Sequence, residues 1–285
     1  EIGASLVDEG AADGDSRVYG TDLRWKIGAA TELRAEVARS ESDDPARAAA
    51  ANAHRAELRH VSERLDARAY IGETEPGFGT GQQLSTEVGM RKAGIDARMR
   101  FGESWQGLTE VFTEEALETG AERKHGSLEL RRETATNRVG FGMRTVEDEG
   151  LTNGTQRSEQ AFASGSVDLW NQRVTLRGSV DAALGGGNSS IDYPNRYVLG
   201  ADYALRPDVK LYTEYEHADG ANFDADMARV GVRATPWNRA QLNSSVSQQA
   251  TEYGPRTFAN FGLTQGWQVT DRLALDAGID QSNTL

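Results

Sequence analysis

The sequence predicts an all-β fold: an antiparallel up-and-down transmembrane β-barrel of about 16–18 strands, with short turns at one end and long loops at the other. Apolar and polar residues alternate over stretches of about ten residues, and such stretches recur along the whole chain. The last hairpin shows this well, because Phe261, Leu263 and Trp267 alternate with small or polar residues. A strand with one apolar and one polar face separates two different surroundings.

The composition excludes several classes of protein. The chain has 285 residues and no cysteine, which excludes a disulfide framework, thiol catalysis and metal sites built on cysteine. It has no run of about eighteen apolar residues, so we expect no membrane-spanning helix. A net charge of -13 argues against non-specific binding of nucleic acid. The basic residues comprise 27 arginines and 4 lysines, and arginine suits planar pairs with carboxylates.

In the first part of the chain, alternating stretches are separated by residues that favour turns. The strands expected there are 1–8, 17–26, 32–37, 55–59, 65–71, 84–90 and 95–101. Segment 102–124 breaks this rhythm. We expect it to extend a strand through Phe112 and then to form a short helix, with Thr113 as its N-cap and Gly120 at its end.

The alternation returns in the second part of the chain, and the total comes to about seventeen strands. The strands expected there contain residues 128–130, 139–143, 161–169, 174–182, 197–205, 209–215, 228–234, 240–246, 258–267 and 273–279.

The expected connections alternate between short and long, which is typical of a meander. Short turns are predicted near residues 28, 62, 93, 135, 172, 207, 237 and 270. Longer polar loops are predicted at 10–15, 42–53, 73–81, 115–124, 147–157, 185–194, 217–226 and 248–256.

Tryptophan gathers beside the predicted short turns. Trp25, Trp170, Trp237 and Trp267 lie next to such turns, and Trp105 is the exception. Amphipathic aromatic side chains at one level are favoured at a membrane–water interface. These four tryptophans are therefore predicted interface residues.

The repeated apolar face needs a partner surface. In water it would have to be buried against a second layer, but the sequence offers no amphipathic helices to cover it. A two-sheet sandwich would bury it too, although so many long strands in a plain meander would be unusual there. Closing the sheet into a barrel within lipid pairs every backbone group and removes both edges. We therefore expect residues 1–285 to form a single β-barrel domain.

At this level the chain resembles a Gram-negative outer-membrane β-barrel of the porin-like kind. The run Gly262-Leu263-Thr264-Gln265-Gly266-Trp267 also looks like the repeats in the C-terminal barrel domain of very large bacterial surface proteins. The resemblance implies a location in the bacterial outer membrane, with lipid against the apolar face. Many such barrels end in an aromatic residue, whereas this chain ends in Leu285.

Strand parity leads to an expectation about the ends of the chain. If the short turns are periplasmic, the first and the last predicted strand both run outward, which gives an odd count. Closure with an even number would require at least one more strand, so either residues are missing at the C-terminus or the strands around 102–124 are miscounted. Since the chain also begins at Glu1 without a visible signal peptide, we expect it to be a partial chain with missing flanking sequence.

The polar face of the early strands is strongly charged and is predicted to line the lumen. It could order the passage of solute and bias ion selectivity, or it could be an ion-pair lattice that stiffens the wall; both are compatible with the sequence. The predicted lumen-facing residues are Arg34, Arg55, Arg59, Arg64, Arg68, Arg91, Arg98, Arg100, Glu32, Glu36, Glu57, Asp66, Glu87 and Asp96. The later strands are less charged and richer in Asn, Ser, Gly and Thr.

No motif supports catalysis or a resident cofactor. Acidic loop clusters such as the one with Asp219, Asp224 and Asp226 could bind calcium, but none has the spacing of a calcium loop, and solvated charge explains them. Neither HExxH nor GxSxG occurs, although a dispersed Ser-His-Asp set stays open. We expect no metal, no cofactor and no enzymatic activity.

Three functions follow as hypotheses. The first is an outer-membrane pore for passage or export of solute or polypeptide, since about sixteen to eighteen strands leave room for an aqueous channel. The second is a plugged barrel that anchors a large surface or adhesin-type protein. The third is a soluble β-rich binding domain. The expected partners are outer-membrane lipid, with other subunits or an upstream surface domain as further candidates, and no nucleic acid.

Overall fold

The chain folds into antiparallel strands that follow one another up and down. The computed structural model describes residues 1–11, 14–43, 49–79, 88–150, 154–185, 192–220 and 223–285. These residues form seventeen β-strands, which confirms the predicted all-β fold class. None of them belongs to a helix long and apolar enough to cross a membrane.

The chain divides into two compact units, and the division passes through β8 (Ala121–Glu133), β9 (Asn137–Glu149) and β10 (Gln156–Leu169). Unit 1 consists of Glu1–Leu130 and Met143–Glu159, and unit 2 consists of Arg131–Gly142 and Gln160–Leu285.

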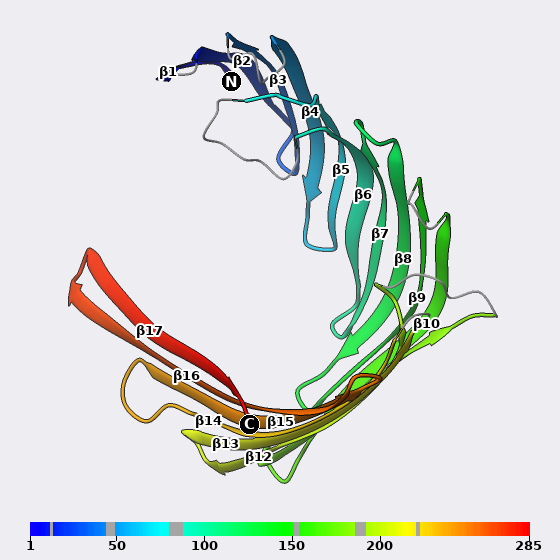
Figure 1. The fold of residues 1–285 in the computed structure, drawn as a ribbon, viewed down its shortest axis with the longest axis vertical. Coiled ribbons are helices and arrows are strands. Elements are labelled where there is room, and N and C mark those ends of the chain that lie inside the picture. Colours follow the sequence, from blue (N-terminus) through cyan, green and yellow to red (C-terminus); the bar gives the residue numbers. More distant parts are fainter. Residues whose placement is uncertain (12–13, 44–48, 80–87, 151–153, 186–191, 221–222) are drawn as a thin grey trace. The chain divides into compact units, whose positions relative to one another are not determined.

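In unit 1 each of the first seven strands pairs antiparallel with the next (Figure 1). They are β1 (Ile2–Ala11), β2 (Gly14–Ile27), β3 (Thr31–Ser42), β4 (Ala50–Val61), β5 (Leu65–Thr74), β6 (Met90–Phe101) and β7 (Trp105–Ala116).

In unit 2 the same rule joins β10 to the strands that follow it. They are β11 (Val174–Ala183), β12 (Asn195–Arg206), β13 (Val209–Gly220), β14 (Phe223–Ala234), β15 (Ala240–Thr251), β16 (Gly254–Thr270) and β17 (Leu273–Thr284).

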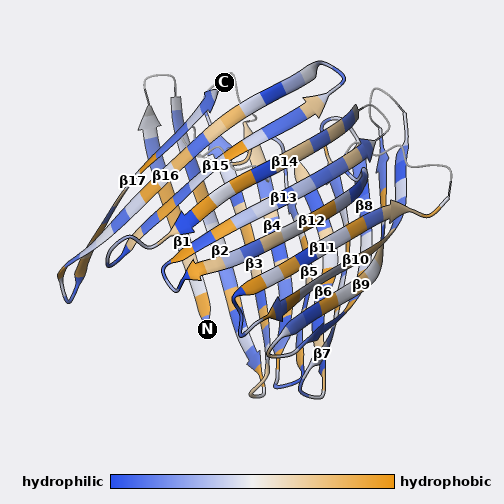
Figure 2. Cartoon of the chain, turned by 90° about the horizontal axis from the view of Figure 1, so that it is seen from below, coloured by the Kyte–Doolittle hydropathy of each residue, from blue (hydrophilic) through white to orange (hydrophobic). Residues whose placement is uncertain are grey.

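The register gives each unit one polar and one apolar face, because paired residues project to the same side of a sheet. In unit 1, Leu33 pairs with Leu58, Leu58 with Ala69, and Ala69 with Ile95. The alternation is visible along the strands in Figure 2, where orange and blue bands succeed one another.

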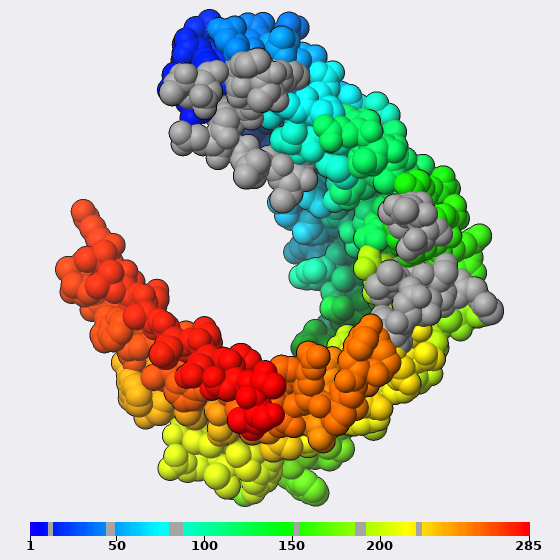
Figure 3. All heavy atoms as spheres, viewed as in Figure 1, coloured from blue at the N-terminus to red at the C-terminus, as the bar shows by residue number. Residues whose placement is uncertain are grey.

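The apolar faces are exposed. Ile95 is 56% exposed in unit 1, and Leu199 is 67% exposed in unit 2. The described strands of both units, whose atoms Figure 3 draws as spheres, all belong to one sheet. The buried apolar side chains among the described residues are scattered: Ala51, Val146, Tyr212, Ala218 and Ala240. Each unit is therefore a single sheet without a conventional core, and its apolar face needs an apolar surrounding.

Two expectations for the middle of the chain were wrong. The helix predicted after Thr113 does not form, because this segment belongs to β7, which pairs with β6 along its whole length. The turn predicted near residue 93 lies inside β6, and the chain turns instead at 102–104. Ala93 and Gly94 are small residues that suggest a turn locally, but pairing with strands on both sides keeps this segment extended. Most of the strand expected at 84–90 lies outside the described residues.

The connections between successive strands fall into two sets that differ in length. Those that lead from an even-numbered strand to the next are short throughout: 28–30, 62–64, 102–104, 134–136, 170–173, 207–208, 235–239 and 271–272. The opposite set contains the longest connections, at 75–89 and 184–194. Three long loops were wrongly predicted, because β1 and β2 extend into segment 10–15 and β13 to β16 extend into segments 217–226 and 248–256. Polar residues at the ends of strands led to the prediction of loops, because the sequence alone does not show that these residues pair with a neighbouring strand.

Candidate functional site

The polar face of unit 1 carries the charged side chains that the sequence singled out. Glu32 is shared by two arginines, with Arg24 Nη2 at 2.8 Å and Arg34 Nε at 2.6 Å from its carboxylate oxygens. On neighbouring strands, Arg68 Nη2 lies 2.8 Å from Asp96 Oδ1. These cross-strand pairs tie the strands together on the polar side.

The register places most of the predicted lumen-facing residues on this face. It brings together Arg34, Arg55, Arg59, Arg68, Arg98, Arg100, Glu32, Glu36, Glu57, Asp66 and Asp96. Arg64 lies in the turn 62–64 beside them, and its carbonyl accepts a hydrogen bond of 2.8 Å from the backbone N–H of Arg100. Glu87 lies outside the described residues. That this face lines a lumen stays a prediction.

Arg91 is the residue that the structure places elsewhere. It pairs with Glu73 and Glu115 in register, on the face that also carries Ile71 and Ile95. Arg91 Nε lies 2.6 Å from Glu73, and Nη1 lies 3.0 Å from Glu115. Because β6 runs unbroken from Met90, Arg91 is in phase with Ile95 and faces away from the other predicted arginines. Its assignment to the charged wall is thus corrected.

At the short-turn end of β4 to β6, arginine outnumbers acid. We call Arg59, Arg64, Arg68, Arg98 and Arg100 the arginine cluster. Arg59 lies 3.7 Å from Asp66 and Arg68 binds Asp96. Among the residues that the structure describes, Arg64, Arg98 and Arg100 have no hydrogen bond or ion pair through their side chains, and all three are exposed.

The polar face of unit 1 also bears aromatic rings that the alternation did not single out. Tyr70 and Phe112 flank Gly94 in register, and Phe112 stacks on His125 with 4.9 Å between ring centroids. Arg68 lies 4.8 Å from the centre of the Tyr70 ring, and Lys92 lies 5.1 Å from that of Phe112. Gly94 leaves the space that the rings occupy, since a Cβ there would lie 2.6 Å from Tyr70 Oη.

Unit 2 contains a charged network that the sequence analysis missed. Arg177 binds both Asp202 and Glu214, the second at 3.0 Å, and Arg233 lies 3.5 Å from Asp202. Arg229 lies 3.7 Å from Glu214. The side chains of Asp202 and Glu214 are only 18% and 21% exposed. These residues come from four strands, so only the register could have revealed that they meet.

All five tryptophans lie in or beside short connections. Trp25 and Trp267 lie near the ends of β2 and β16, and Trp170 and Trp237 lie within connections. Trp105, predicted to be an exception, directly follows the turn 102–104. The misplaced turn near residue 93 caused that error. The five side chains are between 37% and 74% exposed. A position at a membrane interface stays a prediction.

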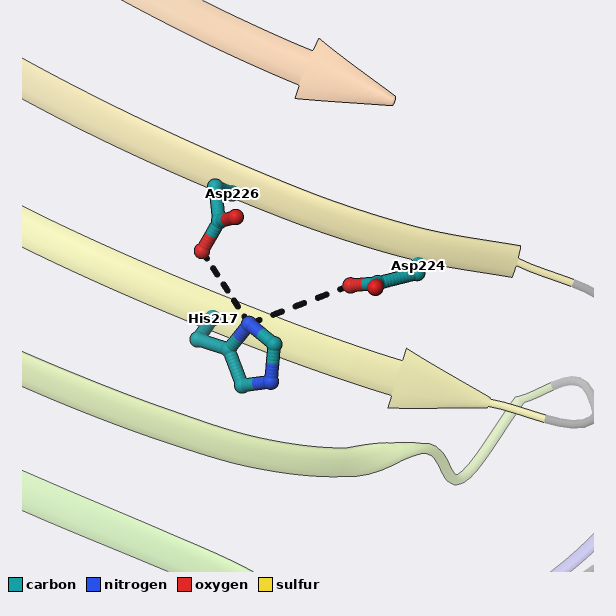
Figure 4. Close-up of side chains that lie close together, drawn as sticks. All are labelled: His217, Asp224 and Asp226. Atoms are coloured by element: carbon teal, nitrogen blue, oxygen red, sulfur yellow. Dashed lines mark hydrogen bonds and ion pairs between the residues drawn. The ribbon is translucent and has the colours of Figure 1, made fainter. Parts of the chain in front are cut away.

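One cluster on the apolar side of unit 2 has residue types that ligate metals. The candidate ligand atoms of His217, Asp224 and Asp226 lie within 4.8 Å of one another (Figure 4). His217 Nδ1 lies 3.0 Å from Asp226 Oδ1, which also accepts a hydrogen bond of 2.6 Å from Tyr215 Oη. The Asp224 side chain is 71% exposed. Bonds within the β13–β14 hairpin account for this arrangement.

Comparisons with known proteins give the fold. No protein-family model and no curated protein matches the chain. The ferric-catecholate import receptor Fiu from E. coli K12, in its open form, aligns with a TM-score of 0.60 and 11% identity, over 99% of this chain and 64% of the receptor. The siderophore receptor PirA from Pseudomonas aeruginosa aligns with a TM-score of 0.58 and 9% identity, over 99% and 64%. A variant of the Rh. blastica porin aligns with a TM-score of 0.47 and 10% identity, over 97% and 100%.

The chain therefore spans about two thirds of the length of the two receptors and shares the strand arrangement of their outer-membrane β-barrels. The predicted resemblance to a Gram-negative outer-membrane β-barrel is confirmed at the level of the fold.

Proposed function

We propose that this chain forms the wall of a β-barrel in the bacterial outer membrane, through which solute passes along the polar face while lipid contacts the apolar face. One observation carries the proposal: each unit is a single sheet whose two faces have opposite chemistry. Exposed apolar side chains on one face, such as Leu58, Ile71 and Ile95, would be costly in water, and lipid removes that cost.

The polar face supports passage over simple anchoring. Its arginines and carboxylates are mostly half-exposed, as the Arg68–Asp96 pair shows with side-chain exposures of 45% and 40%. Such side chains remain accessible to water and to a solute that moves along them. The fold matches one protein that is described as an import receptor and one that is described as a siderophore receptor, which supports a transport-type role in place of an enzymatic one.

Refolding into detergent followed by planar-bilayer recording tests this function. We expect the protein to require detergent or lipid for solubility and to give stable current steps in the nanosiemens range. A variant with aspartate at Leu58 and Ile95 should fail to insert, because charge on the lipid-facing side is expensive. Complete solubility without detergent, together with no insertion, would contradict the membrane location and favour a soluble binding domain.

A second candidate is a receptor or surface anchor whose interior is occupied. The alignments with Fiu and PirA, which are both described as receptors, support the receptor part of this candidate. Insertion into liposomes, shown by protection from protease, combined with no conductance would support this candidate against the open pore.

A further inference from the structure

We propose that the arginine cluster is a binding station for small oxyanions, so that the solutes that pass along this wall are phosphorylated or carboxylated. This inference rests on the proposed function for its transport aspect, whereas the binding itself is measurable without transport. The cluster lies on the polar face of unit 1, where β4, β5 and β6 approach the turns 62–64 and 102–104.

The register forces arginines against one another at this point. Arg59 pairs directly with Arg68, and Arg64 lies opposite Arg100. Side chains directly opposite on an antiparallel pair have Cβ atoms about 5 Å apart, where like charges destabilise the sheet. Side chains two residues apart along a strand lie on the same face, about 7 Å from one another. The side chains of Arg68, Arg98 and Arg100 therefore form one patch.

The acids nearby do not neutralise this patch. Asp66 is in register with Arg98 but meets Arg59, at 3.7 Å, and Asp96 meets Arg68. Glu63 and Glu103, in the adjoining turns, make no ion pair among the described residues. Glu32 lies opposite Arg59 in register but binds Arg24 and Arg34, and Glu57 interacts electrostatically with Arg68. The ion pairs of the cluster that the structure describes are therefore those with Asp66 and Asp96, and the guanidinium groups of Arg64, Arg98 and Arg100 are left with their donors exposed to solvent.

An oxyanion fits this surplus chemically. A guanidinium presents planar, parallel N–H donors that match the oxygens of phosphate and carboxylate. Arg98 and Arg100 project from β6 and Arg64 from the turn that precedes β5, so donors can reach an anion from two sides. Binding would also relieve the repulsion between opposed arginines. Elsewhere on this face Arg34 is paired with a carboxylate, and Arg55 lies opposite Glu36 in register without forming an ion pair among the described residues.

The test compares two triple variants that change the net charge equally. The cluster variant is Arg64→Gln, Arg98→Gln and Arg100→Gln. The control is Arg34→Gln, Arg196→Gln and Arg233→Gln, whose arginines have carboxylate partners. Titration calorimetry in detergent at low salt measures binding of inorganic phosphate and, separately, of succinate. Heat-modifiability on gels confirms that each variant has refolded.

We expect the cluster variant to bind phosphate or succinate about tenfold more weakly than the parent, as loss of charge-assisted hydrogen bonds implies, while the control changes by less than about twofold. The variant with lysine at all three cluster positions should recover part of the affinity. Equal losses in the cluster variant and the control, or no binding by the parent, would overturn the proposal.

Bilayer recording then separates this site from the proposed function. A parent that prefers anions over cations, and loses that preference in the cluster variant alone, supports both. Anion binding that depends on the cluster in a protein without conductance would retain the site and reject the open pore. Conductance with unaltered selectivity and no cluster-dependent binding would reject the site and retain the pore.

Discussion

The arginines on the polar faces of the two units differ in their ion-pair partners. In unit 2, Arg177, Arg229 and Arg233 converge on Asp202 and Glu214, so that each charge has an opposite neighbour. In unit 1 the arginine cluster places Arg59 opposite Arg68, and Arg98 and Arg100 form no ion pair among the described residues, although Arg98 lies opposite Asp66 in register. A mutually satisfied network stabilises a wall, whereas an unsatisfied surplus is available to bind something else.

The two units also share a packing arrangement, in which a tyrosine ring covers a glycine on the neighbouring strand. Tyr70 covers Gly94 in unit 1, and Tyr212 covers Gly231 in unit 2. Packing of an aromatic ring over a glycine compensates for the missing side chain. In unit 2 the ring also meets a charge, since Arg233 lies 4.2 Å from the centre of Tyr212.

The largest difference in the free energy of unfolding should come from replacing these glycines with alanine. A Cβ at Gly231 would lie 2.6 Å from the carbonyl oxygen of Ser244, which is backbone, whereas the closest atom to a Cβ at Gly94 is the hydroxyl of Tyr70. We expect Gly231→Ala to reduce the free energy of unfolding by about 3 kcal/mol and Gly94→Ala by about 1–2 kcal/mol. Urea titration of refolded protein measures both. Gly165→Ala is the control, because its Cβ would meet nothing nearer than 3.6 Å; equal losses in all three variants would contradict the packing argument.

Removing one arginine from each unit gives the next largest difference. Arg177→Gln leaves Asp202 and Glu214 without their main partner, and we expect a loss of about 2 kcal/mol in the free energy of unfolding. Arg98→Gln removes a side chain without an acid partner and should change it by less than about 0.5 kcal/mol. The same urea titration distinguishes them. If Arg98→Gln proved as destabilising as Arg177→Gln, the contrast between the ion-paired network of unit 2 and the unpaired arginines of unit 1 would be wrong.

The smallest effect concerns the tryptophans, where the two units should behave alike. Trp105 and Trp237 lie beside short connections of unit 1 and unit 2, and are 37% and 55% exposed. In variants that retain one of them, with phenylalanine at the other four positions, we expect quenching by lipids brominated near the headgroup. Each single Trp→Phe change should cost less than about 1 kcal/mol. Quenching of Trp237 but not of Trp105 would show that Trp105 lies outside the interface.

The candidate site could be predicted in part. Alternation alone placed residues such as Arg34, Arg68 and Asp96 on one face, because side-chain direction within a strand depends only on parity. Arg91 was misplaced since a turn was expected between it and Ile95. The Arg177 network and the aromatic row with Tyr70 and Phe112 were missed because their members come from different strands.

The sequence by itself determined the class of fold and the opposite chemistry of the two faces, since a period of two residues is a local property of the chain. The expected total of about seventeen strands also agrees, although the sequence did not separate β7 from the strand before it. Only the tertiary structure decided which side chains are neighbours across strands, because register depends on pairing between distant segments. That pairing turned 113–116 into strand, moved a short turn to 102–104 and set Arg64 against Arg100. Arginine is abundant throughout this sequence, and the register made five of them a cluster.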